Sequence, residues 1–64
     1  MVKINGQMEE AEGKTIQMYL QEKHYDFSRL AVECNDKIVP KSEYASFVLK
    51  ENDVLEVVSF VGGG

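Results

Sequence analysis

The amino-acid sequence predicts an α+β fold, in which a mixed sheet of four to five strands carries one main helix on one face. Two observations support this prediction. Short stretches of alternating apolar and polar residues flank a segment in which apolar residues recur at helical spacing. The last apolar stretch, VLEVVSFV, is apolar on both faces, which is typical of a strand in the middle of a sheet. A chain of 64 residues has room for one such unit, so we expect residues 1–64 to form a single domain.

The chain begins with a predicted β-hairpin. Val2 and Ile4 alternate with a polar residue, as in a strand with one buried face. The dipeptide Asn5-Gly6 suits a type I′ turn, because both residues tolerate positive φ. We expect a second short strand at residues 7–11 to return antiparallel to the first.

After the hairpin, the spacing of the apolar residues changes to that of a helix. Thr15 can cap the free amides of a first turn, and Ile16, Tyr19 and Leu20 follow at the i, i+3, i+4 spacing of one helical face. The spacing predicts a helix over residues 16–24.

Two more strands are predicted after the helix. LAVECN alternates like a strand, residues 35–37 resemble a turn, and KIV is a short strand that ends at Pro40, which has no amide to donate. Residues 41–53 look irregular, and we expect Phe47, Val48 and Leu49 to cover one edge of the core.

The final strand, residues 54–61, determines the architecture. Leu55, Val57 and Val61 fall on one face with Ser59, whereas Val54, Glu56, Val58 and Phe60 fall on the other. One helix covers only one face of a sheet, so Val58 and Phe60 are expected to be exposed as a partner surface. In the alternative interpretation, both side chains rest on neighbouring strands or on the loop at residues 41–53.

Composition excludes several classes of function. A net charge of −4 repels a phosphate backbone, so we expect no nucleic-acid partner. No apolar run approaches the roughly 20 residues of a membrane helix, and polar residues interrupt the first stretch where a signal peptide would be apolar. We therefore expect a cytoplasmic protein without a membrane partner.

The residue types that usually bind metals or catalyse reactions are scarce. One cysteine and one histidine do not supply a zinc site. Cys34 falls on the apolar face of an alternating stretch, so we expect it to be buried and inert. His24 has no acidic residue or serine at a spacing typical of a catalytic site. The sequence predicts neither a metal site nor an enzyme active site.

The order strand, strand, helix, strand, short strand, strand is that of the ubiquitin-like β-grasp. Over nearly its whole length the chain also resembles the ThiS family, the sulfur carrier proteins of thiamine biosynthesis. The resemblance rests on TIQMYL at the helix start, NDKIVPKSEY in the middle, NDVLEVV in the last strand and FVGGG at the end. The chain departs from the family at three positions, where it has Lys41, Tyr44 and Asn52 and the family often has arginine, tryptophan and glycine. These departures put none of the motifs that carry the family's chemistry in doubt.

The resemblance implies a function for the terminal glycines. The α-carboxylate of Gly64 would be adenylated with Mg-ATP by a ThiF-like enzyme related to ubiquitin activators. Sulfur from a persulfide donor protein would then displace AMP, and the resulting thiocarboxylate would supply a ThiG-like thiazole synthase. The chain itself would bind no cofactor and would not be an enzyme.

The other site residues also follow from the resemblance. Gly62 and Gly63 lack a Cβ, so a flexible tail at residues 62–64 would thread into the active site of a partner. Val58, Phe60 and Val61 would form the partner interface. Three other functions stay open at this point: a ubiquitin-like modifier of lysines, the small subunit of molybdopterin synthase, and a β-grasp interaction domain with an inert tail.

Overall fold

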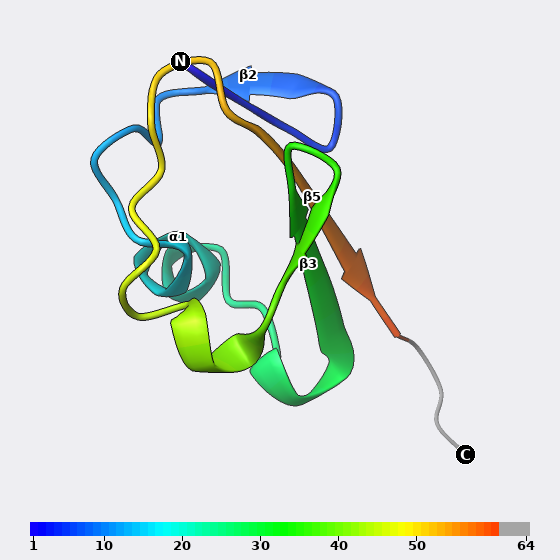
Figure 1. Cartoon of the computed structure of the whole chain (residues 1–64). Coiled ribbons are helices and arrows are strands. Elements are labelled where there is room, and N and C mark those ends of the chain that lie inside the picture. Colours follow the sequence, from blue (N-terminus) through cyan, green and yellow to red (C-terminus); the bar gives the residue numbers. More distant parts are fainter. Residues whose placement is uncertain (61–64) are drawn as a thin grey trace.

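The computed structural model describes residues 1–60, and its sheet has five strands. The sheet order is β2-β1-β5-β3-β4, and β5 lies in the middle (Figure 1). The strands are β1 (Val2–Ile4), β2 (Gln7–Glu9), β3 (Leu30–Cys34), β4 (Lys37–Val39) and β5 (Val54–Ser59). The helices are α1 (Ile16–Glu22) and the 3-10 turns η1 (Phe27–Arg29) and η2 (Lys41–Glu43). Predictions for residue 61 and for the tail at 62–64 lie outside the described residues.

The N-terminal hairpin forms as predicted, but its second strand is shorter. Asn5 and Gly6 have φ values of 49° and 84°, and Val2 pairs with Glu9 in an antiparallel register. The prediction that the strand continues to Ala11 is wrong. The Ala11 amide donates to the Glu9 carbonyl at 3.1 Å, so the chain turns there and buries the Ala11 methyl group.

The helix α1 forms with the predicted cap and buried face, and it ends earlier than expected. Thr15 Oγ1 accepts a hydrogen bond from the Met18 amide at 3.1 Å. Ile16, Tyr19 and Leu20 are buried. The prediction that the helix reaches residue 24 is wrong, because the regular turns stop at Glu22.

A Schellman motif ends this helix. The Tyr25 amide donates to the Leu20 carbonyl at 3.0 Å, and the His24 amide donates to the Gln21 carbonyl at 3.1 Å. His24 has a φ of 61°, the left-handed conformation that this position requires. His24 is thus a helix-ending residue.

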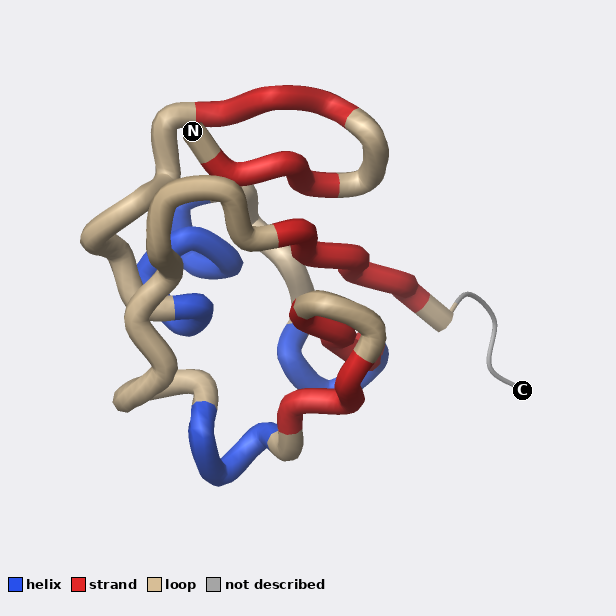
Figure 2. The backbone as a smooth tube through the Cα atoms, turned by 45° about the horizontal axis from the view of Figure 1, so that its top comes forward, coloured by secondary structure: helices blue, strands red, loops and turns tan. Residues whose placement is uncertain are grey.

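The central strand β5 joins the two halves of the sheet. It pairs parallel with β1 at Lys3↔Val54 and antiparallel with β3 over five residue pairs from Leu30↔Ser59 to Cys34↔Leu55. The helix α1 packs on one face of this sheet (Figures 1 and 2). This arrangement confirms the predicted fold class and the central position of the last strand.

The core fills the space between the sheet and α1. It takes alternate residues of the central strands, the inner face of α1 and side chains from the loop after η2. The largest fully buried side chains are Ile16, Leu20, Leu49, Leu55, Val2 and Val32.

The segment from residue 41 to residue 53 contributes to the core with alternate side chains. Leu49 is buried and Phe47 is half-buried, as predicted. Val48 is 46% exposed, so the prediction that it covers the core is wrong. Val48 forms an isolated antiparallel bridge with Thr15, and this extended backbone turns the Val48 side chain away from its two neighbours.

Candidate functional site

The strand β5 leads directly to the glycines that the sequence singles out. Phe60, the residue after β5, donates its backbone N–H to the Arg29 carbonyl at 2.7 Å, and Ser59 pairs with Leu30. The strand is therefore fixed to β3 as far as Ser59, and the next residue, Phe60, is bonded to the end of η1. The predicted roles of residues 61–64 lie outside the described residues.

Asn5 holds the other edge of β5. The β1 ladder ends at the pair Ile4↔Leu55, and beyond it the Asn5 side chain replaces a strand. Asn5 Oδ1 accepts from the Val57 amide at 2.8 Å, and Asn5 Nδ2 donates to the Val57 carbonyl at 3.2 Å. No signal in the sequence pattern indicates this contact, because the hairpin turn already accounts for Asn5.

The outer face of the sheet exposes an apolar surface. Val58 and Phe60 are 53% and 59% exposed, whereas Val57, which precedes Val58 on the opposite face of β5, is buried. The alternative interpretation, that they rest on other parts of the chain, is wrong, because α1 and the core lie on the opposite face. Ile38 is 76% exposed on the edge strand β4, which β3 separates from β5. The role of Val58 and Phe60 as a partner interface stays a prediction.

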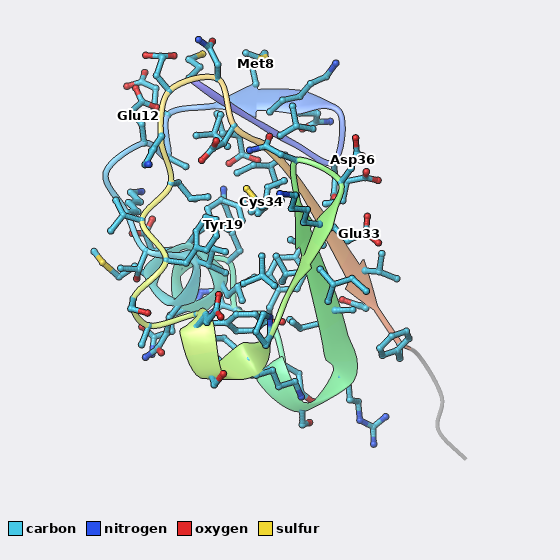
Figure 3. The ribbon with its side chains drawn as sticks, viewed as in Figure 1. Met8, Glu12, Tyr19, Glu33, Cys34 and Asp36 are labelled. Atoms are coloured by element: carbon cyan, nitrogen blue, oxygen red, sulfur yellow. The ribbon has the colours of Figure 1, made fainter. Side chains whose placement is uncertain are left out.

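Two glutamates lie in the middle of this outer face. The β3–β5 register places Glu33 opposite Glu56, and the β3–β4 register places Ile38 on the other side of Glu33. Both carboxylates are exposed, and Figure 3 shows Glu33 directed away from the helix side of the sheet. The sequence pattern does not reveal this pair. Each glutamate is the polar member of an alternating stretch, but only the register shows that the two are neighbours.

Cys34 is buried on the inner face, as predicted. Figure 3 shows its sulfur directed toward the interior, on the side opposite Glu33. Burial, assisted by the charge of Asp53, raises the pKa of the Cys34 thiol and so disfavours the nucleophilic thiolate. Within residues 1–60 no three metal-ligating side chains form a cluster, and no helix in that range is long and apolar enough to cross a membrane.

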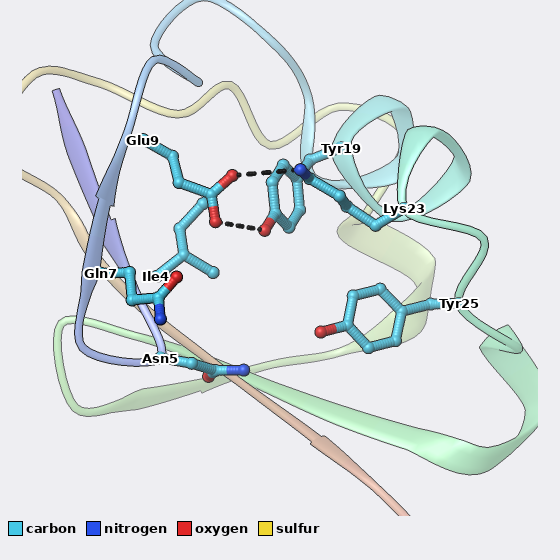
Figure 4. A pocket seen from close by; sticks show the side chains of 7 residues that line it. All are labelled: Ile4, Asn5, Gln7, Glu9, Tyr19, Lys23 and Tyr25. Carbon is cyan, nitrogen blue, oxygen red and sulfur yellow. Dashed lines mark hydrogen bonds and ion pairs between the residues drawn. The ribbon is translucent and has the colours of Figure 1, made fainter.

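A pocket of about 510 Å³ opens between the hairpin and α1 (Figure 4). Its lining residues are Ile4, Asn5, Gln7, Glu9, Tyr19, Lys23 and Tyr25. The Tyr19 hydroxyl donates to Glu9 Oε2 at 3.0 Å, and Lys23 Nζ lies 3.5 Å from Glu9 Oε1. Burial and the bond to Glu9 raise the pKa of Tyr19, so the hydroxyl stays protonated. The three polar groups thus satisfy one another.

The chain is similar to two thiazole synthases, of which it spans only a small part. It is 46% identical to the thiazole synthase of Paramagnetospirillum magneticum over 50 residues, which are 78% of this chain and 15% of that protein. It is 38% identical to the thiazole synthase of Magnetococcus marinus over 64 residues, which are 98% of this chain and 20% of that protein.

Smaller proteins match the chain along its full length. The sulfur carrier protein ThiS of Thermus thermophilus is 34% identical over 64 residues, which cover 100% of both chains. The crystal structure of the thiamine biosynthesis protein ThiS from Geobacter metallireducens superposes with a TM-score of 0.77 at 24% identity. This superposition covers 98% of this chain and 97% of that one, and it supports the β-grasp fold. The family model described as "ThiS family" matches residues 2–64. The chain therefore belongs to the ThiS family.

Proposed function

We propose that this chain is a sulfur carrier of thiamine biosynthesis, and that the α-carboxylate of Gly64 carries the sulfur. The observation that supports the proposal most strongly is the family match over residues 2–64, because it includes the whole glycine run. Residues 1–60 contain no other candidate for the site that carries the sulfur. Cys34 is buried, and the polar groups of the pocket are paired with one another.

The chemistry begins with activation of a poor electrophile. A C-terminal carboxylate is ionised at neutral pH, so its carbonyl carbon resists attack. An oxygen of this carboxylate attacks the α-phosphate of Mg-ATP on a ThiF-like enzyme, and pyrophosphate leaves. The product is an acyl-adenylate, a mixed anhydride in which AMP is a good leaving group. The Mg-ATP belongs to that enzyme, and the carrier holds no cofactor of its own.

The second stage replaces AMP by sulfur. The terminal sulfur of a persulfide donor protein attacks the activated carbonyl and expels AMP. A thiol then cleaves the S–S bond and supplies two electrons, which leaves a thiocarboxylate on Gly64. This soft nucleophile delivers its sulfur to a thiazole synthase. The likeness to segments of two thiazole synthases supports that enzyme class as the acceptor.

The protein supplies the surface that partners recognise and the terminal segment that enters their active sites, whereas the partners supply the catalytic groups. The strand β5 is fixed on both edges, by Asn5 and by β3, so it is a firm base for the segment that follows. Gly62 and Gly63 have no Cβ, which allows a partner's backbone to approach closely. Val58, Phe60 and Val61 form the interface. We place these steps in the cytoplasm, where ATP is available.

Intact mass spectrometry tests the proposal. The chain is incubated with Mg-ATP, a cognate adenylating enzyme and a persulfide donor, and we expect it to exchange one oxygen for one sulfur at Gly64. A variant with one residue appended after Gly64 is the matched control and should not react. The proposal fails if the mass stays unchanged with an enzyme that activates its own carrier, or if the sulfur appears on Cys34. An amide bond to a lysine would instead identify a protein modifier.

A further inference from the structure

The backbone and the side chain of Asn5 make three hydrogen bonds to β5. The Asn5 backbone amide donates to the Leu55 carbonyl at 3.0 Å. The side-chain oxygen accepts from the Val57 amide at 2.8 Å, and the side-chain nitrogen donates to the Val57 carbonyl at 3.2 Å. The side-chain carboxamide is therefore held against β5 as long as the hairpin stays paired with that strand.

The residue after Asn5 has the backbone nitrogen best suited to attack this carboxamide. Gly6 is exposed in the turn, with a φ of 84°, and no atom lies within 4 Å of the position that a Cβ would take. Glycine lacks the Cβ that crowds the backbone nitrogen of every other residue. Attack by the following backbone nitrogen is one reason why asparagine is a thermolabile residue. The Asn5-Gly6 turn thus carries both reacting groups.

The other two asparagines of the chain have less reactive neighbours. Asn35 and Asn52 are each followed by an aspartate, Asp36 and Asp53. A Cβ crowds the nitrogen that would attack in both places. The local sequence therefore favours the reaction most at Asn5, and the contact with β5 is what restrains it there.

We propose that Asn5 is a covalent modification site, which contact with β5 keeps closed and separation of the hairpin from β5 opens. In the open state the Gly6 nitrogen gives its proton to hydroxide and attacks Asn5 Cγ. The bond between Gly6 N and Cγ forms, the bond between Cγ and Nδ2 breaks, and the nitrogen leaves as ammonia after taking a proton from water. The product is a cyclic succinimide.

Water then opens the succinimide ring at either of its two carbonyl groups. Hydrolysis at Cγ gives aspartate, and hydrolysis at the main-chain carbonyl of residue 5 gives isoaspartate. The net reaction consumes one water and releases one ammonia, with no change of oxidation state. The modification is independent of the chemistry proposed at Gly64.

Either product weakens the contact that kept the site closed. Aspartate retains an acceptor for the Val57 amide but has no donor for the Val57 carbonyl. Isoaspartate routes the main chain through the side-chain carbons, which lengthens a two-residue turn that fits few backbone geometries. A modified hairpin therefore pairs less tightly with β5, and refolding does not restore the original contact.

The test follows the conversion of Asn5 by mass spectrometry of proteolytic peptides, with isoaspartate and aspartate separated by chromatography. The chain is incubated at one mildly alkaline pH, either folded in buffer or unfolded in guanidinium chloride. We expect conversion at Asn5 to be about a hundredfold or more slower in the folded chain, because only the open fraction reacts. In the denaturant, Gly6→Ala should slow conversion, because its Cβ crowds the attacking nitrogen.

Two variants test whether separation from β5 controls the rate in the folded chain. Val57→Ala removes buried side-chain volume and keeps the β5 backbone, so it should raise the open fraction and accelerate conversion about tenfold. Phe60→Ala is the matched control, because it shortens an exposed side chain, and its rate should follow that of the original chain. Neither substitution changes Asn5 or Gly6.

Denaturant provides the same test without a substitution. In guanidinium chloride concentrations that leave most of the original chain folded, the rate at Asn5 should rise with concentration as the open fraction rises. Modified chain that is purified and refolded should melt at a lower temperature than the original chain.

Four results would overturn the proposal. They are a folded-state rate equal to the rate in denaturant, a rate that does not rise in low denaturant, equal rates for Val57→Ala and Phe60→Ala, and faster conversion at Asn35 or Asn52 than at Asn5. An unchanged melting temperature of the modified chain would also contradict the role of the Asn5 side chain in closing the site.

Discussion

Asn5 has two structural functions, and each uses a different part of the residue. Its backbone adopts a φ of 49° in the hairpin turn, and its side-chain amide binds both backbone polar groups of Val57. Asparagine suits both, because it tolerates the left-handed region and carries a donor and an acceptor. The side chain thereby continues the edge of β5 for two residues past the last β1 pair.

We expect Asn5→Ala to lower the free energy of unfolding by about 1–3 kcal/mol, because it leaves the part-buried Val57 amide and carbonyl without partners. Thermal or urea unfolding measures the change. Asn5→Asp is the informative comparison, because it keeps the acceptor and loses the donor. A loss in Asn5→Asp that equals the loss in Asn5→Ala would show that the acceptor contributes nothing.

At the scale of the element, the end of α1 is determined by a single residue in an unfavourable conformation. The Schellman motif needs a left-handed residue at position 24, where glycine is usual and this chain has histidine. A residue with a Cβ is strained in this region. The neighbouring hydrogen bonds from His24 and Tyr25 hold the conformation in place.

We expect His24→Gly to raise the free energy of unfolding by up to about 1 kcal/mol, since glycine relieves the left-handed strain and loses part of that gain to its freedom in the unfolded chain. His24→Ala keeps the strain and should not stabilise the protein. The melting temperatures of the two variants provide the measurement. A lower melting temperature for His24→Gly than for His24→Ala would contradict this account of the helix end.

At the scale of the whole molecule, β5 contributes to the core with one face and exposes the other, to which we expect the partner to bind. Leu55 and Val57 belong to the core, whereas Val58 and Phe60 are exposed. A domain of this size has only about 3–5 kcal/mol of stability from its core. Few inner residues can therefore be changed without unfolding it, and the outer face is free to specify partners.

The variants Val57→Ala and Phe60→Ala should separate these two functions. Val57→Ala leaves a cavity in the core and should cost about 1–3 kcal/mol, seen as an early melting transition. Phe60→Ala should change stability by less than about 0.5 kcal/mol, because the ring is exposed. It should instead raise KM for the activating enzyme about tenfold or more, as expected for an aromatic anchor. Equal melting temperatures for the two variants would show that Phe60 belongs to the core.

The sequence by itself determined the type and order of the elements, the Asn5-Gly6 turn, the burial of Cys34 and the exposure of Val58 and Phe60. These features follow from periodicity and turn chemistry within a few neighbouring residues. Only the tertiary structure decided that α1 ends at Glu22, that Asn5 binds Val57 and that Glu33 lies opposite Glu56. Asn5 and Val57 are 52 positions apart in the sequence (57 − 5). Glu33 and Glu56 are 23 positions apart (56 − 33). The register of a ladder between distant strands depends on packing throughout the domain, and local pattern does not encode it.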